Sequence, residues 1–106
     1  MVLTVVLGFV AGFFAGNGIP YYIAGSTGSG VSPSPFRQTP VTNVIVGWIA
    51  LVIAGVAWMF TDTHAHPLPT YAAAAVGVLA VGLIHARNWG TDPWHRPRAG
   101  AAADGA

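Results

Sequence analysis

The sequence predicts an all-α membrane protein with three transmembrane helices. Residues 2–25, 41–60 and 70–86 contain no Asp, Glu, Lys or Arg. Of the 106 residues, 54% are hydrophobic and only 7% are charged, against about 25% charged in soluble domains. Buried helices of a soluble protein would need polar outer faces, whereas these segments are apolar on all sides. A lipid bilayer is the solvent that favours them.

The lengths of the segments set the predicted elements. A membrane-spanning helix needs about 20 residues, which gives spans of about 2–24, 41–60 and 69–87 in a single transmembrane domain, residues 1–87. The connection between the second and third spans is short, so we expect these two helices to pack as an antiparallel pair.

The remaining segments are polar and rich in small residues. The first connection, GSTGSGVSPSPFRQTP, predicts a turn-rich path because Gly and Pro disfavour a helix. Residues 88–106 form a short tail that ends in AGAAADGA, and we expect that ending to be disordered because it has no core to bury.

The arginines predict the orientation of the chain. Arg37 lies in the first connection, and Arg87, Arg96 and Arg98 lie at or beyond the end of the third span. Three spans place all four on the same side, and basic residues near short membrane flanks stay in the cytoplasm. The carboxyl terminus is therefore predicted to be cytoplasmic and the amino terminus to lie outside.

Glycines mark the predicted helix-packing faces. In lipid, close backbone approach replaces the hydrophobic effect as the force that associates helices. Two overlapping GxxxG motifs occur on the first span, and glycines recur on the other two. The candidate packing residues are Gly8, Gly12, Gly16, Gly47, Gly55 and Gly77. These faces could serve the chain's own helices or a second copy.

A kink or a break is predicted in the first span, at the run Asn17-Gly18-Ile19-Pro20. Pro20 has no amide hydrogen, and Gly18 adds backbone freedom. Asn43 lies at similar depth. One interpretation is a structural knot in which Asn17 and Asn43 satisfy the freed backbone groups. The other is a binding site formed by a discontinuous helix, as in transporters.

The same region carries a resemblance to a known family. The chain resembles a family of small uncharacterised bacterial three-span membrane proteins with the pattern N-x-I-P…S-P-F…N-V-x-x-G. The matching residues are Asn17, Ile19, Pro20, Gly25, Ser34, Pro35, Phe36, Asn43, Val44 and Gly47. Tyr21, Tyr22 and Val46 depart from it, standing where the family has His, Phe and Trp. The resemblance implies three spans in a bacterial inner membrane and draws attention to the first connection, without naming an activity.

Candidate chemistry is sparse. Asp62, His64 and His66 are weak candidates for a metal site in the second connection, because loop histidines are usually only solvated. His85 lies near the end of the third span, where we expect a neutral, hydrogen-bonded imidazole or one that reaches toward the interface. No acidic residue lies inside a span, which argues against a proton-coupled exporter. The chain has no cysteine, and no cofactor is predicted.

These observations predict a non-enzymatic structural or accessory component that acts by helix association. The alternative is a small oligomeric channel or transporter for a neutral solute, which would use the break at residues 17–20. A third hypothesis is a metal-binding protein that uses His64 and His66. The expected partners are the lipid bilayer and either further copies of the chain or a larger membrane complex. No nucleic acid is expected, because the chain has no Lys and no basic cluster.

Overall fold

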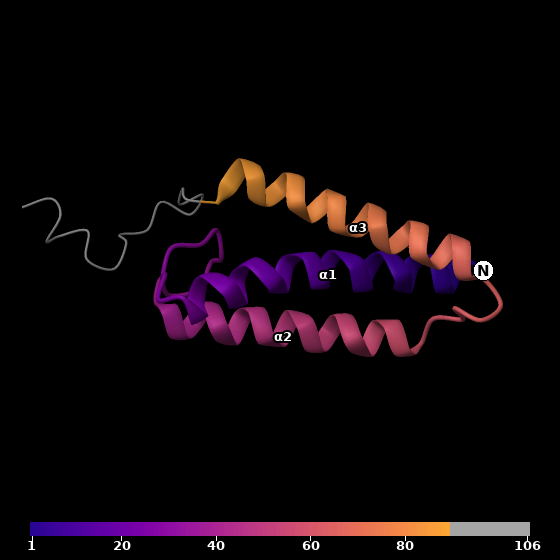
Figure 1. Ribbon diagram of the computed structural model, residues 1–106, viewed down its shortest axis with the longest axis horizontal. Helices are drawn as coiled ribbons and strands as arrows, with labels where there is room; N and C mark the ends of the chain where they lie inside the picture. The colour runs from indigo at the N-terminus through magenta and orange to yellow at the C-terminus, as the bar shows by residue number, and fades with distance from the viewer. Residues whose placement is uncertain (90–106) are drawn as a thin grey trace, which may run out of the picture.

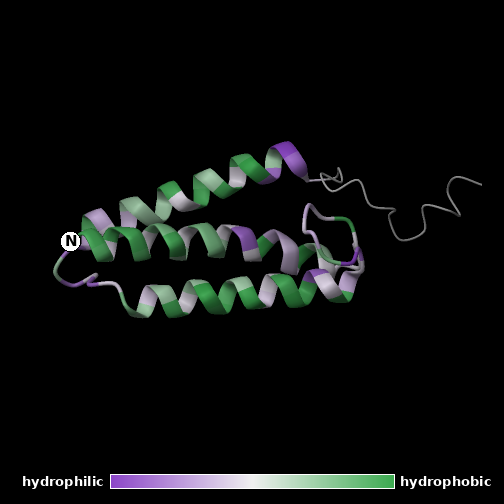
Figure 2. Ribbon diagram, turned by 180° about the vertical axis from the view of Figure 1, so that it is seen from behind, coloured by the Kyte–Doolittle hydropathy of each residue, from purple (hydrophilic) through white to green (hydrophobic). Residues whose placement is uncertain are grey.

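The computed structural model describes residues 1–89, which form three α-helices and no strand. Helix α1 spans Val2–Ser26, α2 spans Pro40–Met59 and α3 spans Pro67–Asn88. Each helix is long and apolar enough to cross a membrane, and Figure 2 shows hydrophobic residues along most of their length. The predicted fold class, all-α with three membrane-spanning helices, is confirmed. The tail segment that was expected to be disordered lies outside the described residues.

Helix α1 is the centre of the molecule, with α2 on one side and α3 on the other (Figure 1). Helix α2 runs antiparallel to α1, and α3 runs parallel to it. Within the described part of the chain, the backbones of α2 and α3 do not contact each other. The predicted antiparallel pair of second and third spans is therefore wrong. A short loop holds two helices together only at one end, and the small residues of α1 allow a closer approach to both neighbours.

Helix α1 has a seven-residue repeat of buried residues, and Gly18 and Gly25 of this repeat pack against α2. Thr4, Ala11, Gly18 and Gly25 of α1 are all buried, and each is seven residues from the next. The buried residues of α2 are Asn43, Gly47, Ala50, Ala54 and Ala57. A methyl group on Gly18 would lie 2.7 Å from the carbonyl oxygen of Gly47. Alternating steps of three and four residues are typical of helices that cross at a small angle.

The α1–α3 interface has a four-residue repeat instead. Gly8, Gly12 and Gly16 of α1 face α3, where Gly77, Val81 and His85 are buried at the same spacing. A methyl group on Gly16 would lie 2.7 Å from Cγ1 of Val81. Ridges of residues four apart on both helices are typical of the steeper crossing seen in GxxxG pairs.

Helix α1 continues through Pro20 without a break. The sequence predicted either a kink or a break at residues 17–20, and the break is absent. Figure 1 shows instead that the carboxy-terminal part of α1 leans toward α2. A break would leave several backbone groups without partners at membrane depth, whereas a bent helix loses only the bond that Pro20 cannot donate.

Proline and capping residues fix the starts of the other two helices. Pro40 and Pro67 occupy the first helical position of α2 and α3, where no amide hydrogen is needed. Thr39 caps α2, and its side chain accepts a hydrogen bond from Thr42 N at 3.2 Å. Residues 27–39 form the α1–α2 loop and residues 60–66 the α2–α3 loop, at opposite ends of the molecule (Figure 1).

Candidate functional site

An apolar groove runs between α2 and α3, because α1 holds these two helices apart. It has a volume of about 420 Å³. Its floor is formed by Ala11, Gly12 and Ala15 of α1, and its walls include Gly55 and Trp58 of α2 and Tyr71 and Val78 of α3. We name this feature the α2–α3 groove. The rings of Trp58 and Tyr71 meet edge to face at 5.4 Å between centroids.

Gly55 differs from the glycines at the two interfaces. A methyl group on Gly8, Gly12, Gly16, Gly47 or Gly77 would overlap atoms of a neighbouring helix. A methyl group on Gly55 would meet no atom within 4 Å among the described residues, and the same holds for Gly82. Five of the six candidate packing glycines thus lie between the chain's own helices, while Gly55 lies open on the wall of the α2–α3 groove.

A polar junction joins α1 to α3 near the α1–α2 loop. Asn17 Oδ1 accepts a hydrogen bond from His85 Nε2 at 2.9 Å. The amide oxygen can only accept, so this pairing requires the Nε2-protonated imidazole. His85 is 9% exposed, and a polar group at this depth needs such a partner because lipid supplies none.

Aromatic rings pack against His85. Tyr21 lies edge to face with His85, with 5.6 Å between ring centroids, and with Trp89 at 4.9 Å. Sequence reasoning did not bring these rings together. The signal was present, because Asn17 and Tyr21 are four residues apart on α1 and His85 and Trp89 are four apart on α3.

Asn43, in the first turn of α2, belongs to a different site and faces the α1–α2 loop. It is fully buried, and its Nδ2 donates to the carbonyl oxygens of Ser29 at 2.9 Å and Val31 at 3.5 Å. Its Oδ1 has no hydrogen-bond partner among the described residues. The predicted knot of Asn17 and Asn43 is therefore wrong, because each amide binds its own partner on a different side of α1.

The α1–α2 loop is held by buried polar side chains. Ser32 N donates to Gln38 Oε1 at 2.8 Å, and Gln38 Nε2 donates to Ser32 O at 2.7 Å. Ser34 is also buried, and its hydroxyl accepts from Phe36 N at 3.1 Å. Pro35 and Phe36 are exposed. The motif singled out by the family resemblance thus consists of one buried anchor followed by two outward residues.

The three candidate metal ligands in the α2–α3 loop do not converge. No group of three metal-binding side chains occurs anywhere in residues 1–89. Asp62 Oδ1 instead accepts from Ala65 N at 3.3 Å, and Asp62 N donates to Thr4 Oγ1 at 2.8 Å. The Thr4 hydroxyl also lies 3.3 Å from that of Thr70. This loop therefore fixes the start of α1 rather than forming a metal-ligand cluster.

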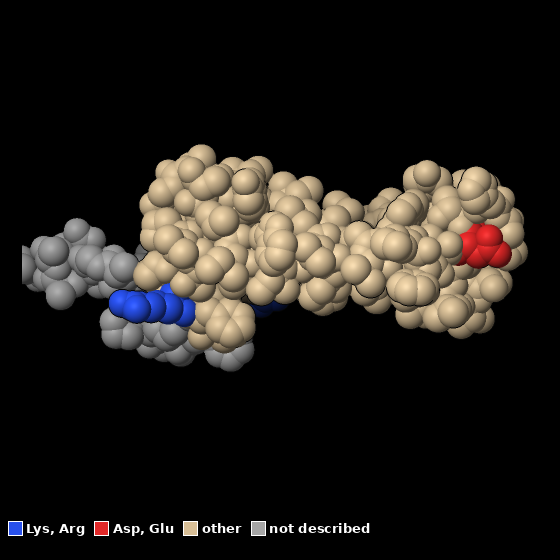
Figure 3. All heavy atoms as spheres, turned by 90° about the horizontal axis from the view of Figure 1, so that it is seen from below, with Lys and Arg blue, Asp and Glu red and all other residues tan. Residues whose placement is uncertain are grey.

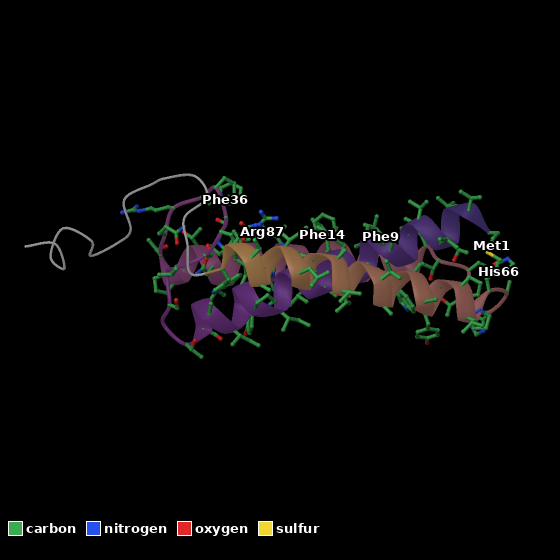
Figure 4. The ribbon with its side chains drawn as sticks, turned by 90° about the horizontal axis from the view of Figure 1, so that it is seen from above. Met1, Phe9, Phe14, Phe36, His66 and Arg87 are labelled. Carbon is green, nitrogen blue, oxygen red and sulfur yellow. The ribbon has the colours of Figure 1, made fainter. Side chains whose placement is uncertain are left out.

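Charge separates the two ends of the molecule. The basic side chains of the described residues lie at the end with the α1–α2 loop, and the acidic side chain lies at the other end (Figure 3). Figure 4 likewise places Phe36 and Arg87 near one end and Met1 and His66 near the other.

Of the predicted residues at 17–20, Gly18 is packed against α2, while Ile19 is exposed and faces outward.

Comparison with known proteins assigns no relative. No protein-family model, no curated protein and no solved structure matches the chain. The resemblance to small bacterial membrane proteins stays a prediction.

Proposed function

We propose that this protein is a non-enzymatic structural component of the bacterial inner membrane that acts by helix association, and that its first partner is a second copy of itself. The α2–α3 groove, with Gly55 open on its wall, carries the proposal. Within this chain, every other glycine of the predicted packing set already contacts a neighbouring helix.

The composition of the groove favours a helix as its occupant. Ala and Gly on the floor and Gly55 on the wall leave room for close backbone contact, which is the main source of affinity between helices in lipid. The closing rings of Trp58 and Tyr71 give the groove a defined end. An annular lipid could fill the space, but a helix gains many more fixed contacts there.

A second copy fits because Gly55 can pair with itself. Two copies inserted with the same orientation are related by a two-fold axis along the membrane normal. Such an axis brings the same surface of both chains together. If it passes beside Gly55, each α2 rests on the edge of the other chain's groove, and the two glycines permit close approach.

The same proposal includes an orientation. We infer that the end with Arg37 and Arg87 lies in the cytoplasm, because basic residues near short membrane flanks are retained on that side. The amino terminus and the α2–α3 loop then face outward.

The transporter alternative is less well supported by the geometry. It depends on a discontinuous helix with free polar groups, as in transporters. Helix α1 is continuous over Val2–Ser26, and the Asn17 side chain is already bound to His85.

The test uses two glycines, Gly55 and Gly82, that both face open space. Gly55→Leu adds a side chain to the groove wall at a position whose Cβ meets no atom of the described chain within 4 Å, and Gly82→Leu does the same outside the groove. Analytical ultracentrifugation of the full chain in detergent should show a dimer for the wild type and for Gly82→Leu, and a monomer for Gly55→Leu. A monomeric wild type, or a Gly55→Leu variant that remains dimeric, would overturn the proposal.

A further inference from the structure

The α1–α2 loop presents an aromatic and a basic side chain side by side. Phe36 is 58% exposed and Arg37 is also exposed. The backbone on both sides of them is fixed, because Phe36 N donates to Ser34 Oγ at 3.1 Å and Thr39 N donates to Arg37 O at 3.0 Å. A pre-ordered pair loses little conformational freedom when it binds a ligand.

A second groove begins at this pair and follows α2. Its volume is about 380 Å³, within the range of small-ligand sites. It is lined by Phe36, Arg37, Thr42, Ile45, Val46 and Ile49. We name it the Arg37 groove. It has a cationic end at the loop and an apolar stem along the helix, and it shares no residue with the α2–α3 groove.

The charge of Arg37 has no nearby acid to balance it in the described part of the chain. The one carboxylate side chain in residues 1–89 is Asp62, which lies in the α2–α3 loop at the opposite end of the molecule. A guanidinium presents several donors in a planar fork that matches the oxygens of a phosphate group.

We propose that the Arg37 groove binds one anionic phospholipid from the leaflet that borders the α1–α2 loop. The phosphate accepts hydrogen bonds from the Arg37 guanidinium, and an acyl chain lies along Ile45 and Ile49. Phe36 covers the junction between headgroup and chain, a depth that aromatic side chains favour. The groove thus offers a cationic contact for the headgroup and an apolar contact for the acyl chain. The two contacts follow each other in the same direction as the headgroup and chain of a lipid in the membrane.

Native mass spectrometry of the full chain tests the headgroup contact. The probes are phosphatidylglycerol and phosphatidylcholine with identical acyl chains, in mixed micelles. The wild type should retain one phosphatidylglycerol in preference to phosphatidylcholine. Arg37→Gln should weaken that binding about fivefold, as expected for one basic residue near an anionic lipid surface. Arg87→Gln, at the same end of the molecule, should bind as the wild type does.

A second pair of variants tests the apolar stem. Ile49→Trp narrows the groove and should lower phosphatidylglycerol binding, whereas Ile53→Trp, one turn further along α2 and outside the groove, should not. Soluble glycerol phosphate should fail to compete, because it has no chain to occupy the stem.

Several results would overturn the assignment. Equal losses in Arg37→Gln and Arg87→Gln would mean general attraction of lipid to positive charge. Unchanged phosphatidylglycerol binding in Arg37→Gln or in Ile49→Trp would show that the Arg37 groove is not the binding site. Equal retention of the two lipids would show the same. The two tests are independent, because dimer formation is read from variants of Gly55 and Gly82 and lipid binding from variants at other positions.

Discussion

The two faces of α1 solve the same packing problem in different ways. Toward α2, small residues recur every seven positions and the polar contact comes from the α1–α2 loop, through Asn43. Toward α3, glycines recur every four positions and the polar contact lies within the interface, between Asn17 and His85. Both faces need small residues, because lipid gives apolar helices no hydrophobic reason to associate.

The spacing of the small residues, rather than polarity, decides which helix packs on which face of α1. A seven-residue repeat keeps two helices together over their whole length, and a four-residue repeat lets them cross and separate. Helix α1 combines both, so α2 follows it closely while α3 diverges from it toward the α1–α2 loop (Figure 1). The α2–α3 groove lies in the other half of the molecule, over Ala11, Gly12 and Ala15, where α1 separates the two outer helices.

The largest expected effect comes from Gly12→Leu. Its first side-chain carbon would lie 2.7 Å from both the Cα and the carbonyl carbon of Ala74, which are backbone atoms that cannot move aside. We expect a loss of roughly 3 kcal/mol, at the upper end for overpacked sites, measured as thermal unfolding in detergent. Val10→Leu is the matched control and should melt as the wild type does.

Comparison with Gly18→Leu makes this prediction specific to one face. The chain has no cysteine, so a disulfide between Thr4→Cys and Thr70→Cys in the double variant reports only the α1–α3 contact. The two hydroxyls lie 3.3 Å apart there. Gly12→Leu should lower the disulfide yield of this pair, and Gly18→Leu, which faces Gly47, should preserve it. Equal yields in both backgrounds would show that the two faces are not independent.

The sequence alone was sufficient for the number of helices and for their approximate ends. The length of each segment without charged residues decides both the number of helices and their ends, and neither depends on tertiary contacts. It did not predict the central position of α1, because all three segments are apolar on every side and hydropathy gives no inward face. The repeat of Thr4, Ala11, Gly18 and Gly25 is visible only when residue size is used in place of hydropathy.

The polar contacts were predicted only in part. Asn17 required a partner at its own depth, and the sequence offered both Asn43 and His85, but in the structure Asn43 lies beside Gly25, about two turns further along α1. The choice depends on rotation about the helix axis, which the bend near Pro20 alters and the sequence does not state. The bonds between Gln38 and Ser32 had no signal at all, since polar residues in a proline-rich loop ordinarily face water.

A smaller effect is expected at the junction of α1 and α3. Asn17→Leu leaves His85 Nε2 without its partner, and His85→Leu leaves Asn17 Oδ1 without its own. Removing both restores an apolar contact, so the double variant should be less destabilised than the sum of the single variants. The coupling should be about 0.6 kcal/mol, the average for hydrogen bonds between membrane helices, and below about 1.7 kcal/mol. Additive losses would mean that the pair contributes no interaction energy.

A further small effect is expected at Thr4, where the two faces of α1 meet. Its hydroxyl accepts from Asp62 N at 2.8 Å and lies 3.3 Å from the hydroxyl of Thr70, so one side chain ties α1 both to the α2–α3 loop and to α3. Thr4→Val keeps the shape and removes both contacts. We expect a loss of about 1 kcal/mol, most of it from the backbone amide of Asp62.

Thr70→Val separates the two contributions at Thr4. The Thr70 hydroxyl donates to His66 O at 2.6 Å within its own helix turn, so its proton is already committed. In the contact between the two hydroxyls, Thr4 must therefore be the donor and Thr70 the acceptor. The Thr4 oxygen at the same time accepts from Asp62 N. Thr4→Val should therefore cost about the same in the wild type and in Thr70→Val, within the ~0.3–0.5 kcal/mol typical of independent sites. A larger coupling, measured by unfolding of the four variants, would show that the hydroxyl pair rather than the loop amide joins the two faces of α1.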